Sequence, residues 1–197
     1  MKVTWVKGYP SGKEEGTFLV VDMGGTHLRV MQVHISPNDR SLGANIQEDF
    51  PLPTRIKTGS AGQLWDFIAG VVGAFIEKRV APLQKISKGD KIPLALTFSY
   101  PVHQLCINRG ILQRWTKDFR VSEAVGHEVV AQFQQALEQN VSISLFPCFF
   151  FFFFFTLDLF MQKTPVKVVA LVNDTTSTLV AVSSQASERM FCCCWWR

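Results

Sequence analysis

Apolar residues in this chain occur in two kinds of pattern, and each kind predicts a different element. Short runs rich in valine, isoleucine, leucine and phenylalanine, bounded by turn residues, predict β-strands. Such strands are expected at about 17–22, about 28–35, 92–98 and 166–172, with a further strand within 44–52.

Apolar residues at steps of one, three and four predict amphipathic helices instead. One helix is expected over 60–80, with Ser60 as its N-cap and Pro82 as its stop. A second is expected from Ser122 or Glu123 to about Asn140. Strands that alternate with helices predict an α/β fold in which helices pack on a sheet.

Polar residues follow several of the expected strands. Asp22, Ser99 and Asp174 each come at or just after the end of an apolar run. In α/β sheets, ligands gather beyond the carboxyl ends of the strands. We therefore expect these three side chains to lie near a binding site.

The sequence Asp22-Met23-Gly24-Gly25-Thr26 separates the first two expected strands, and Arg29 follows it. The two glycines allow close approach of backbone to a ligand. A carboxylate, free backbone amides, a hydroxyl and a guanidinium suit a magnesium-bound polyphosphate. An ordinary hairpin with a Gly-Gly turn explains the same residues equally well.

Composition narrows the class of protein. The chain has 197 residues, 47% of them hydrophobic, which is enough for a substantial core, and a formal net charge of +4. Lys and Arg are scattered, which argues against nucleic acid as a partner. The N-terminus lacks the apolar run of a signal peptide. The five cysteines include three in succession at 192–194, with neither zinc spacing nor a disulfide pattern, which favours a cytoplasmic protein.

Three segments carry a family resemblance when taken together: 22–29, 98–119 and 173–176. The middle segment includes Phe98-Ser99-Tyr100-Pro101 and, further on, Trp115-Thr116-Lys117. With Asn173-Asp174-Thr175-Thr176, these motifs resemble the hexokinase family, specifically its fungal hexokinase and glucokinase group, over roughly 3–140 and 165–181. The resemblance implies the small domain of hexokinase, an α/β fold of the actin-like ATPase (ribonuclease H-like) class with a mixed sheet and flanking helices.

The resemblance also implies an activity, the ATP-dependent phosphorylation of glucose or a related hexose at its 6-hydroxyl. ATP phosphates would be bound by the first motif, which comprises Asp22, Gly24, Gly25, Thr26, His27 and Arg29. Asp22 would in addition hold Mg²⁺ through water. The sugar would be bound by Ser99, Thr116, Lys117, Asn173 and Asp174. Asp174 would be the catalytic base that takes the proton of the 6-hydroxyl, a role that suits a carboxylate within hydrogen-bond reach.

Each of these residues has an ordinary structural explanation when taken alone. Ser99 could cap a strand end, Lys117 could be a surface lysine, and Asn173 with Asp174 could cap a helix. The joint pattern of the three segments favours the functional interpretation.

Four positions depart from the family pattern. His27 stands in place of Asn, and Asp118 and Ser177 each stand in place of Gly. Asp49 falls where yeast-type sequences carry a Lys associated with ATP. A carboxylate there would repel phosphates, so we expect that contact to be lost.

The expected organisation is a lead-in segment at 1–16, a hexokinase small domain at 17–181, and a tail at 182–197 outside the family pattern. Residues 141–162 interrupt the domain and contain a run of phenylalanines at 149–155. We interpret them as a translated intron, because Val141 and Ser142 can be encoded by a splice donor, and Met161 and Gln162 by an acceptor. The apolar stretch 145–160 is shorter than the ~20 residues of a membrane span.

The second lobe of a hexokinase has no counterpart in this sequence. Closure of one lobe on the other excludes water in hexokinase-type catalysis, so we expect little or no activity from this chain by itself. Two alternatives remain open at this point. One is a non-catalytic sugar-binding or regulatory protein related to hexokinase, and the other is a membrane-attached protein that uses the phenylalanine segment.

Overall fold

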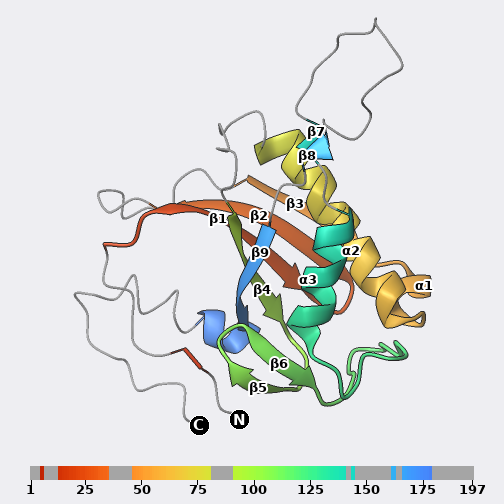
Figure 1. Cartoon of the computed structure of the whole chain (residues 1–197). Coiled ribbons are helices and arrows are strands. Elements are labelled where there is room, and N and C mark those ends of the chain that lie inside the picture. The colour runs from red at the N-terminus through yellow and green to blue at the C-terminus, as the bar shows by residue number, and fades with distance from the viewer. Residues whose placement is uncertain are drawn as a thin grey trace, which may run out of the picture.

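The structure is a computed structural model that describes residues 5–6, 13–35, 46–80, 91–140, 143–144, 161–162 and 166–178. Its centre is a five-stranded sheet with the strand order β3-β2-β1-β4-β9 (Figure 1). The strands are β1 (Gly16–Met23), β2 (His27–Ile35), β3 (Ile46–Pro51), β4 (Ile92–Phe98) and β9 (Val166–Val172). β1 pairs antiparallel with β2 and parallel with β4, and β4 pairs parallel with β9. The expected mixed sheet and its strand positions are confirmed.

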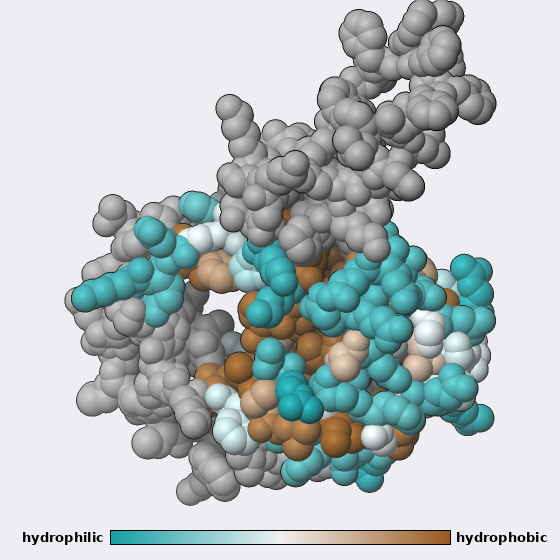
Figure 2. Space-filling model, viewed as in Figure 1, coloured by the Kyte–Doolittle hydropathy of each residue, from teal (hydrophilic) through white to brown (hydrophobic). Residues whose placement is uncertain are grey.

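Helices cover one face of this sheet. They are α1 (Thr54–Lys57), α2 (Ala61–Phe75), which continues into the π-helical turn η1 (Ile76–Val80), and α3 (Val129–Asn140). Figure 1 shows α2 and α3 side by side on the same side of the sheet. In Figure 2 the helices present hydrophilic residues, and hydrophobic residues gather beside them over the strands.

The start of α2 follows from its sequence. Ser60 Oγ accepts a hydrogen bond from the N–H of Gln63, and Gln63 Oε1 accepts one from the N–H of Ser60. This reciprocal capping box satisfies two amides that the first helical turn leaves free. The buried face of α2 carries Leu64, Trp65, Ile68, Val72 and Phe75. The prediction of Ser60 as N-cap is confirmed, whereas Pro82 lies outside the described residues.

The predicted start of the second helix at Ser122 or Glu123 is wrong, because α3 begins at Val129. Glu123 has φ 60° and Gly126 has φ 83°, both in the left-handed region, so the backbone is in turns there. The carboxylate of Glu128 instead accepts hydrogen bonds from the N–H groups of Val130 (3.1 Å) and Ala131 (2.6 Å). A side chain that satisfies the first amides of a helix marks its beginning.

The hairpin of β5 (Val102–Cys106) and β6 (Arg109–Leu112) was not predicted. It attaches to the outer edge of β9, where the N–H of Leu171 donates to the carbonyl of Ile107 at 2.7 Å. Gln104 Nε2 donates to the carbonyl of Leu171 on the same edge. The hairpin therefore covers part of an edge strand and builds one wall of the site described below.

The backbone on either side of the phenylalanine run is paired. β7 (Ile143–Ser144) runs antiparallel to β8 (Met161–Gln162), with Ser144 opposite Met161. The expectations for 145–160, for the tail at 182–197 and for most of the lead-in segment fall outside the described residues. Within the part of the chain that is described, no helix has both the length and the apolar character to cross a bilayer.

Candidate functional site

One row of residues crosses all five strands of the sheet near the carboxyl end of β1. The pairing registers place Asp49 opposite Arg29, Arg29 opposite Asp22, Asp22 opposite Thr97, and Thr97 opposite Val172. Directly paired residues project their side chains to the same face of a sheet. The neighbours of Asp22 in β1, Val21 and Met23, are fully buried. The row therefore lies on the face opposite to the one that these buried residues occupy.

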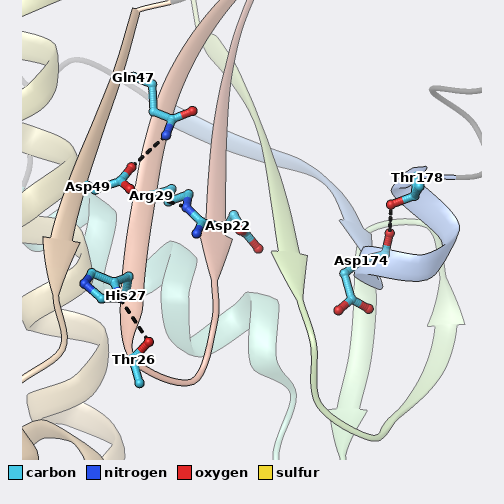
Figure 3. Close-up of polar contacts among 8 residues, drawn as sticks. All are labelled: Asp22, Thr26, His27, Arg29, Gln47, Asp49, Asp174 and Thr178. Atoms are coloured by element: carbon cyan, nitrogen blue, oxygen red, sulfur yellow. Dashed lines mark hydrogen bonds and ion pairs between the residues drawn. The ribbon is translucent and has the colours of Figure 1, made fainter.

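Two carboxylates share the guanidinium of Arg29 in this row (Figure 3). Arg29 Nη1 lies 3.1 Å from Asp22 Oδ2, and Arg29 Nε lies 3.5 Å from Asp49 Oδ2. Gln47 Nε2 also donates to Asp49 Oδ1 at 2.8 Å. The three charged groups carry a net charge of about −1, so Arg29 is not an unopposed cation. The sequence pattern had suggested a fixed positive charge at this position, and two flanking carboxylates modify that expectation.

The Gly24–Gly25 turn presents backbone amides beside this row. The N–H of Gly24 donates to the carbonyl of His27 at 3.1 Å, which closes the turn. The amides of Gly25 and Thr26 find no acceptor among the described residues. Thr26 Oγ1 lies 3.0 Å from His27 Nδ1, so these two side chains bond to each other. Two free N–H groups and one hydroxyl next to a carboxylate suit a phosphate that carries a magnesium ion.

A cavity of about 540 Å³ opens at the ends of β4 and β9. Three of the five predicted sugar-binding residues line it, namely Ser99, Thr116 and Asn173. The cavity walls also include Tyr100, Gln104 and Arg114, to which the sequence pattern had assigned no role. The hydroxyl, amide and guanidinium groups give this cavity several hydrogen-bond donors and acceptors, as recognition of a polyhydroxylated ligand requires.

Asn173 and Asp174 begin a helical turn that runs to residue 178. Asn173 Oδ1 accepts from the N–H of Thr175 at 3.0 Å, and Asp174 Oδ1 accepts from the same N–H at 2.8 Å. These bonds are those of a helix cap, so both residues have the structural role that either could have alone. Asp174 is exposed and its Oδ2 has no partner among the described residues. It lies beside Asn173 but does not itself line the cavity.

The loop at residues 116–119 has an unusual backbone. Lys117 has φ 57° and Asp118 has φ 64°, both left-handed. Glycine is the residue that adopts this conformation without steric cost. Asp118, which stands where the sequence resemblance implied Gly, therefore occupies a position at which Gly has a physical advantage.

Lys117 does not line the cavity. Its Nζ lies 5.5 Å from the centroid of the Tyr100 ring, and a Cβ added at Gly25 would lie only 3.1 Å from its Cδ. The aliphatic part of Lys117 thus packs against the glycine turn, and its ammonium group lies over an aromatic ring. Because this side chain occupies the space beside Gly25, a larger residue than glycine would have to displace it.

Tyr100 is one of the residues of the site that sequence reasoning missed. Its side chain is 3% exposed, and its hydroxyl donates to the carbonyl of Gly24 at 2.8 Å. Burial raises the pKa of this phenol, and the nearby carboxylate of Asp22 raises the pKa further, so the group stays a protonated donor. The sequence did offer one signal for Tyr100, because an aromatic residue with a hydroxyl follows Ser99 directly at the end of a buried strand.

The two groups of predicted residues lie at the same end of the sheet but do not form one closed pocket. Figure 3 shows Asp22 near the end of β1 and Asp174 just beyond β9, with β4 between them. The described cavity is not lined by Asp22, and no cluster of three or more His, Cys, Asp or Glu side chains is found within the described segments. Adjacent strands are about 4.8 Å apart, so the row from Asp22 to Val172 spans roughly 10 Å.

Comparison with known proteins shows which family the chain resembles. The sequence model of a family described as Hexokinase matches residues 1–184. A hexokinase of Emericella nidulans is 38% identical over 183 residues, which are 93% of this chain and 32% of the relative. Hexokinase-2 of Saccharomyces cerevisiae is 39% identical over 178 residues, 90% of this chain and 31% of the relative.

A solved structure shares the fold. The hexokinase of Schistosoma mansoni, determined in complex with glucose, superposes with a TM-score of 0.71 at 28% identity, covering 94% of this chain and 35% of that one. The chain spans about a third of the length of the curated relatives it matches. The family match over nearly the whole sequence, together with the mixed sheet and its flanking helices, establishes that this chain belongs to the hexokinase family.

Proposed function

We propose that this chain is the small lobe of an enzyme that transfers the γ-phosphoryl group of ATP to the 6-hydroxyl of glucose or a related hexose. The observation that supports the proposal is that a polar cavity and the glycine turn lie at one end of one sheet. The cavity lined by Ser99, Thr116 and Asn173 and the glycine turn beside Asp22 are about two strands apart. A sugar in the first and a phosphate chain at the second would be close enough to meet.

The roles follow from the groups that each residue offers. Ser99, Thr116 and Asn173 would hydrogen-bond the sugar hydroxyls, with Lys117 supporting the loop that carries Thr116. Asp174 would accept the proton of the 6-hydroxyl at its free Oδ2, since a carboxylate within reach of the attacking hydroxyl is a suitable base. Selectivity for one hexose would come from buried polar groups that a wrong isomer leaves unpaired.

The phosphates and their metal would be bound at the turn. The free amides of Gly25 and Thr26 would donate to phosphate oxygens, with His27 holding the Thr26 hydroxyl in place. Asp22 would bind Mg²⁺ through water and Arg29 would balance part of the charge. Mg²⁺ usually keeps several waters and takes only one or two protein carboxylates, so a single carboxylate fits it. Mg²⁺ would neutralise charge on the transferred phosphate.

We further propose that the protein acts in the cytoplasm as an enzyme of glycolysis, and that this polypeptide alone turns over little or no substrate. A family member needs a second lobe to enclose the reactants. The second candidate function is a non-catalytic, hexokinase-like sugar-binding or regulatory protein. The sharing of Arg29 between Asp22 and Asp49 favours it, because the phosphate site then has less positive charge than it needs.

Two measurements on the full chain test the proposal. Calorimetric titration with glucose should show binding, and Thr116→Val should weaken it about two- to tenfold, the usual value of one uncharged hydrogen bond. Gln135→Ala, at an exposed position on α3, is the control and should bind like the unaltered chain. A coupled assay with ATP, Mg²⁺ and glucose should detect little turnover. Absence of glucose binding would refute the sugar site, and rapid turnover would refute the requirement for a second lobe.

A further inference from the structure

We propose that Tyr100 is a positioning residue, which holds the glycine turn in its phosphate-binding shape from the wall of the sugar cavity. The inference rests on the proposed function, since it concerns the two sites assigned above. It goes beyond that function by naming the connection between them. Tyr100 belongs to both sites, because it lines the cavity and donates its hydroxyl proton to Gly24.

The first contact fixes the turn directly. The hydroxyl of Tyr100 lies 2.8 Å from the carbonyl oxygen of Gly24, and the side chain is 3% exposed. The carbonyl of Gly24 belongs to the peptide whose N–H is that of Gly25, so a bond to this carbonyl also orients the Gly25 amide. Without the hydroxyl, the carbonyl would need another donor, and its peptide plane would be free to rotate.

The second contact is made by Lys117, which packs against both Tyr100 and Gly25. Lys117 lies with its ammonium over the Tyr100 ring and with its methylene groups against Gly25. Gly24, Tyr100, Lys117 and Gly25 thus touch in sequence and return to the turn. A displacement of the loop would move the side chain against which Gly25 rests.

The third contact anchors Tyr100 to the residues that flank Thr116. Its ring meets Trp115 edge-on at 5.0 Å between centroids, and Phe119 at 5.3 Å, while Trp115 stacks on Phe119 at 5.2 Å. Such aromatic contacts are directional as well as apolar. The side chain that holds the turn is therefore fixed by the same loop that brings Thr116 to the sugar cavity.

The test is Tyr100→Phe in the full chain, which removes the hydroxyl and keeps the ring. The control is Trp65→Phe, which removes another aromatic donor, the indole N–H that bonds Gln132 Oε1 at 3.0 Å between α2 and α3. Both variants lose one partly buried hydrogen bond, so both lose stability. Only the first should change the turn.

The first readout needs no ligand. Amide hydrogen exchange at Gly24, whose N–H bonds the carbonyl of His27, should accelerate about tenfold in Tyr100→Phe beyond any change in Trp65→Phe. Equal exchange at Gly24 in the two variants would overturn the positioning role. Because no ligand is involved, this result stands even if the proposed function fails.

The second readout uses tripolyphosphate with Mg²⁺, followed by the amide resonances of Gly25 and Thr26. The affinity for tripolyphosphate should fall at least fivefold in Tyr100→Phe and stay within twofold in Trp65→Phe, and glucose binding by the unaltered chain is measured beside it. An unchanged tripolyphosphate affinity in Tyr100→Phe would overturn the inference. Failure of the unaltered chain to bind either ligand would refute the proposed function instead.

Discussion

Arg29 and Asp49 form an ion pair across β2 and β3, with Arg29 Nε 3.5 Å from Asp49 Oδ2. The same guanidinium bonds Asp22 at 3.1 Å on its other side. The repulsion that the sequence led us to expect from Asp49 is therefore partly offset, because Asp49 is paired with Arg29. The cost is that Arg29 divides its charge between two carboxylates.

Asp49→Asn should raise the affinity of the chain for tripolyphosphate with Mg²⁺ about threefold. It removes one negative charge near the turn and leaves Arg29 with Asp22 alone. The effect is small because the side chain of Asp49 is 46% exposed and solvent screens it. Nuclear magnetic resonance titration of the Gly25 and Thr26 amides measures the affinity.

Ionic strength separates this charge effect from a change of shape. The increase in tripolyphosphate affinity caused by Asp49→Asn should be largest at low salt. It should shrink as the Debye length falls to about 8 Å at physiological ionic strength. Asp66→Asn, on α2, removes an equal charge away from the row and should leave the affinity unchanged. A fall in affinity on Asp49→Asn would contradict the prediction.

Asp118 is predicted to be a strained position. Its φ of 64° lies in the left-handed region, which costs an alanine about 1–2 kcal/mol and a glycine almost nothing. Asp118→Gly should therefore have a higher free energy of unfolding than Asp118→Ala by about 1 kcal/mol. Urea denaturation of the two variants, at equal pH and salt, measures the difference. Equal stabilities would show that the loop relaxes out of this conformation.

The sheet could be predicted from sequence because its signal is local. β4 and β9 are mostly apolar runs, interrupted only by Thr97 and Lys167 respectively, and both were predicted with their observed bounds. The start of α3 could not be predicted in this way. Val125 fits the helical spacing, yet it is 46% exposed, because the positive φ of Glu123 and Gly126 turns the chain first.

The residues of the candidate site also differ in whether a local sequence signal predicts them. Ser99, Thr116 and Asn173 were named from motifs and do share a cavity, although their binding roles remain predictions. Tyr100 and the hairpin of β5 and β6 were missed, because their importance lies in contacts between distant parts of the chain. The bond from Tyr100 to Gly24 joins residues 76 positions apart, and no spacing rule reports such a contact.

Glu48 makes a pH-dependent contribution to the free energy of unfolding. Its hydrogen bonds to Arg79 and Lys78, at 2.6 and 3.1 Å, lower the pKa of this carboxyl below its ordinary value. A carboxyl whose pKa is lower in the folded chain stabilises the fold above its unfolded pKa. That contribution is lost as the pH falls through the folded pKa.

The stability difference between the unaltered chain and Glu48→Gln should therefore be present at pH 7 and should decline below about pH 4.3, the ordinary value for glutamate. Urea midpoints measured across this range give the difference directly. Glu77→Gln is the control, because Glu77 makes no ion pair within the described segments. A difference that grows as the pH falls would contradict the assigned direction.

Residues 141–162 are predicted to be dispensable for the fold. β7 and β8 pair antiparallel at the two ends of the phenylalanine run, so the backbone enters and leaves that run on adjacent strands. Paired residues in such a ladder lie about 4.5–5.5 Å apart, so Ile143 and Gln162, which lie just inside the two ends of the deletion, are close together. Deletion of 141–162 should leave the free energy of unfolding within about 1 kcal/mol, the size of the effect of a typical single substitution.

The same deletion should reduce aggregation, because an apolar run without charge or proline is an aggregation-prone segment. Light scattering and glucose titration of the shortened chain measure the two effects. Deletion of 149–155 alone, which keeps β7 and β8, is the matched comparison and should also reduce scattering. If the longer deletion unfolds the chain while the shorter one does not, then 141–162 belongs to the fold. A mature transcript that retains the codons for 141–162 would separately refute the intron interpretation.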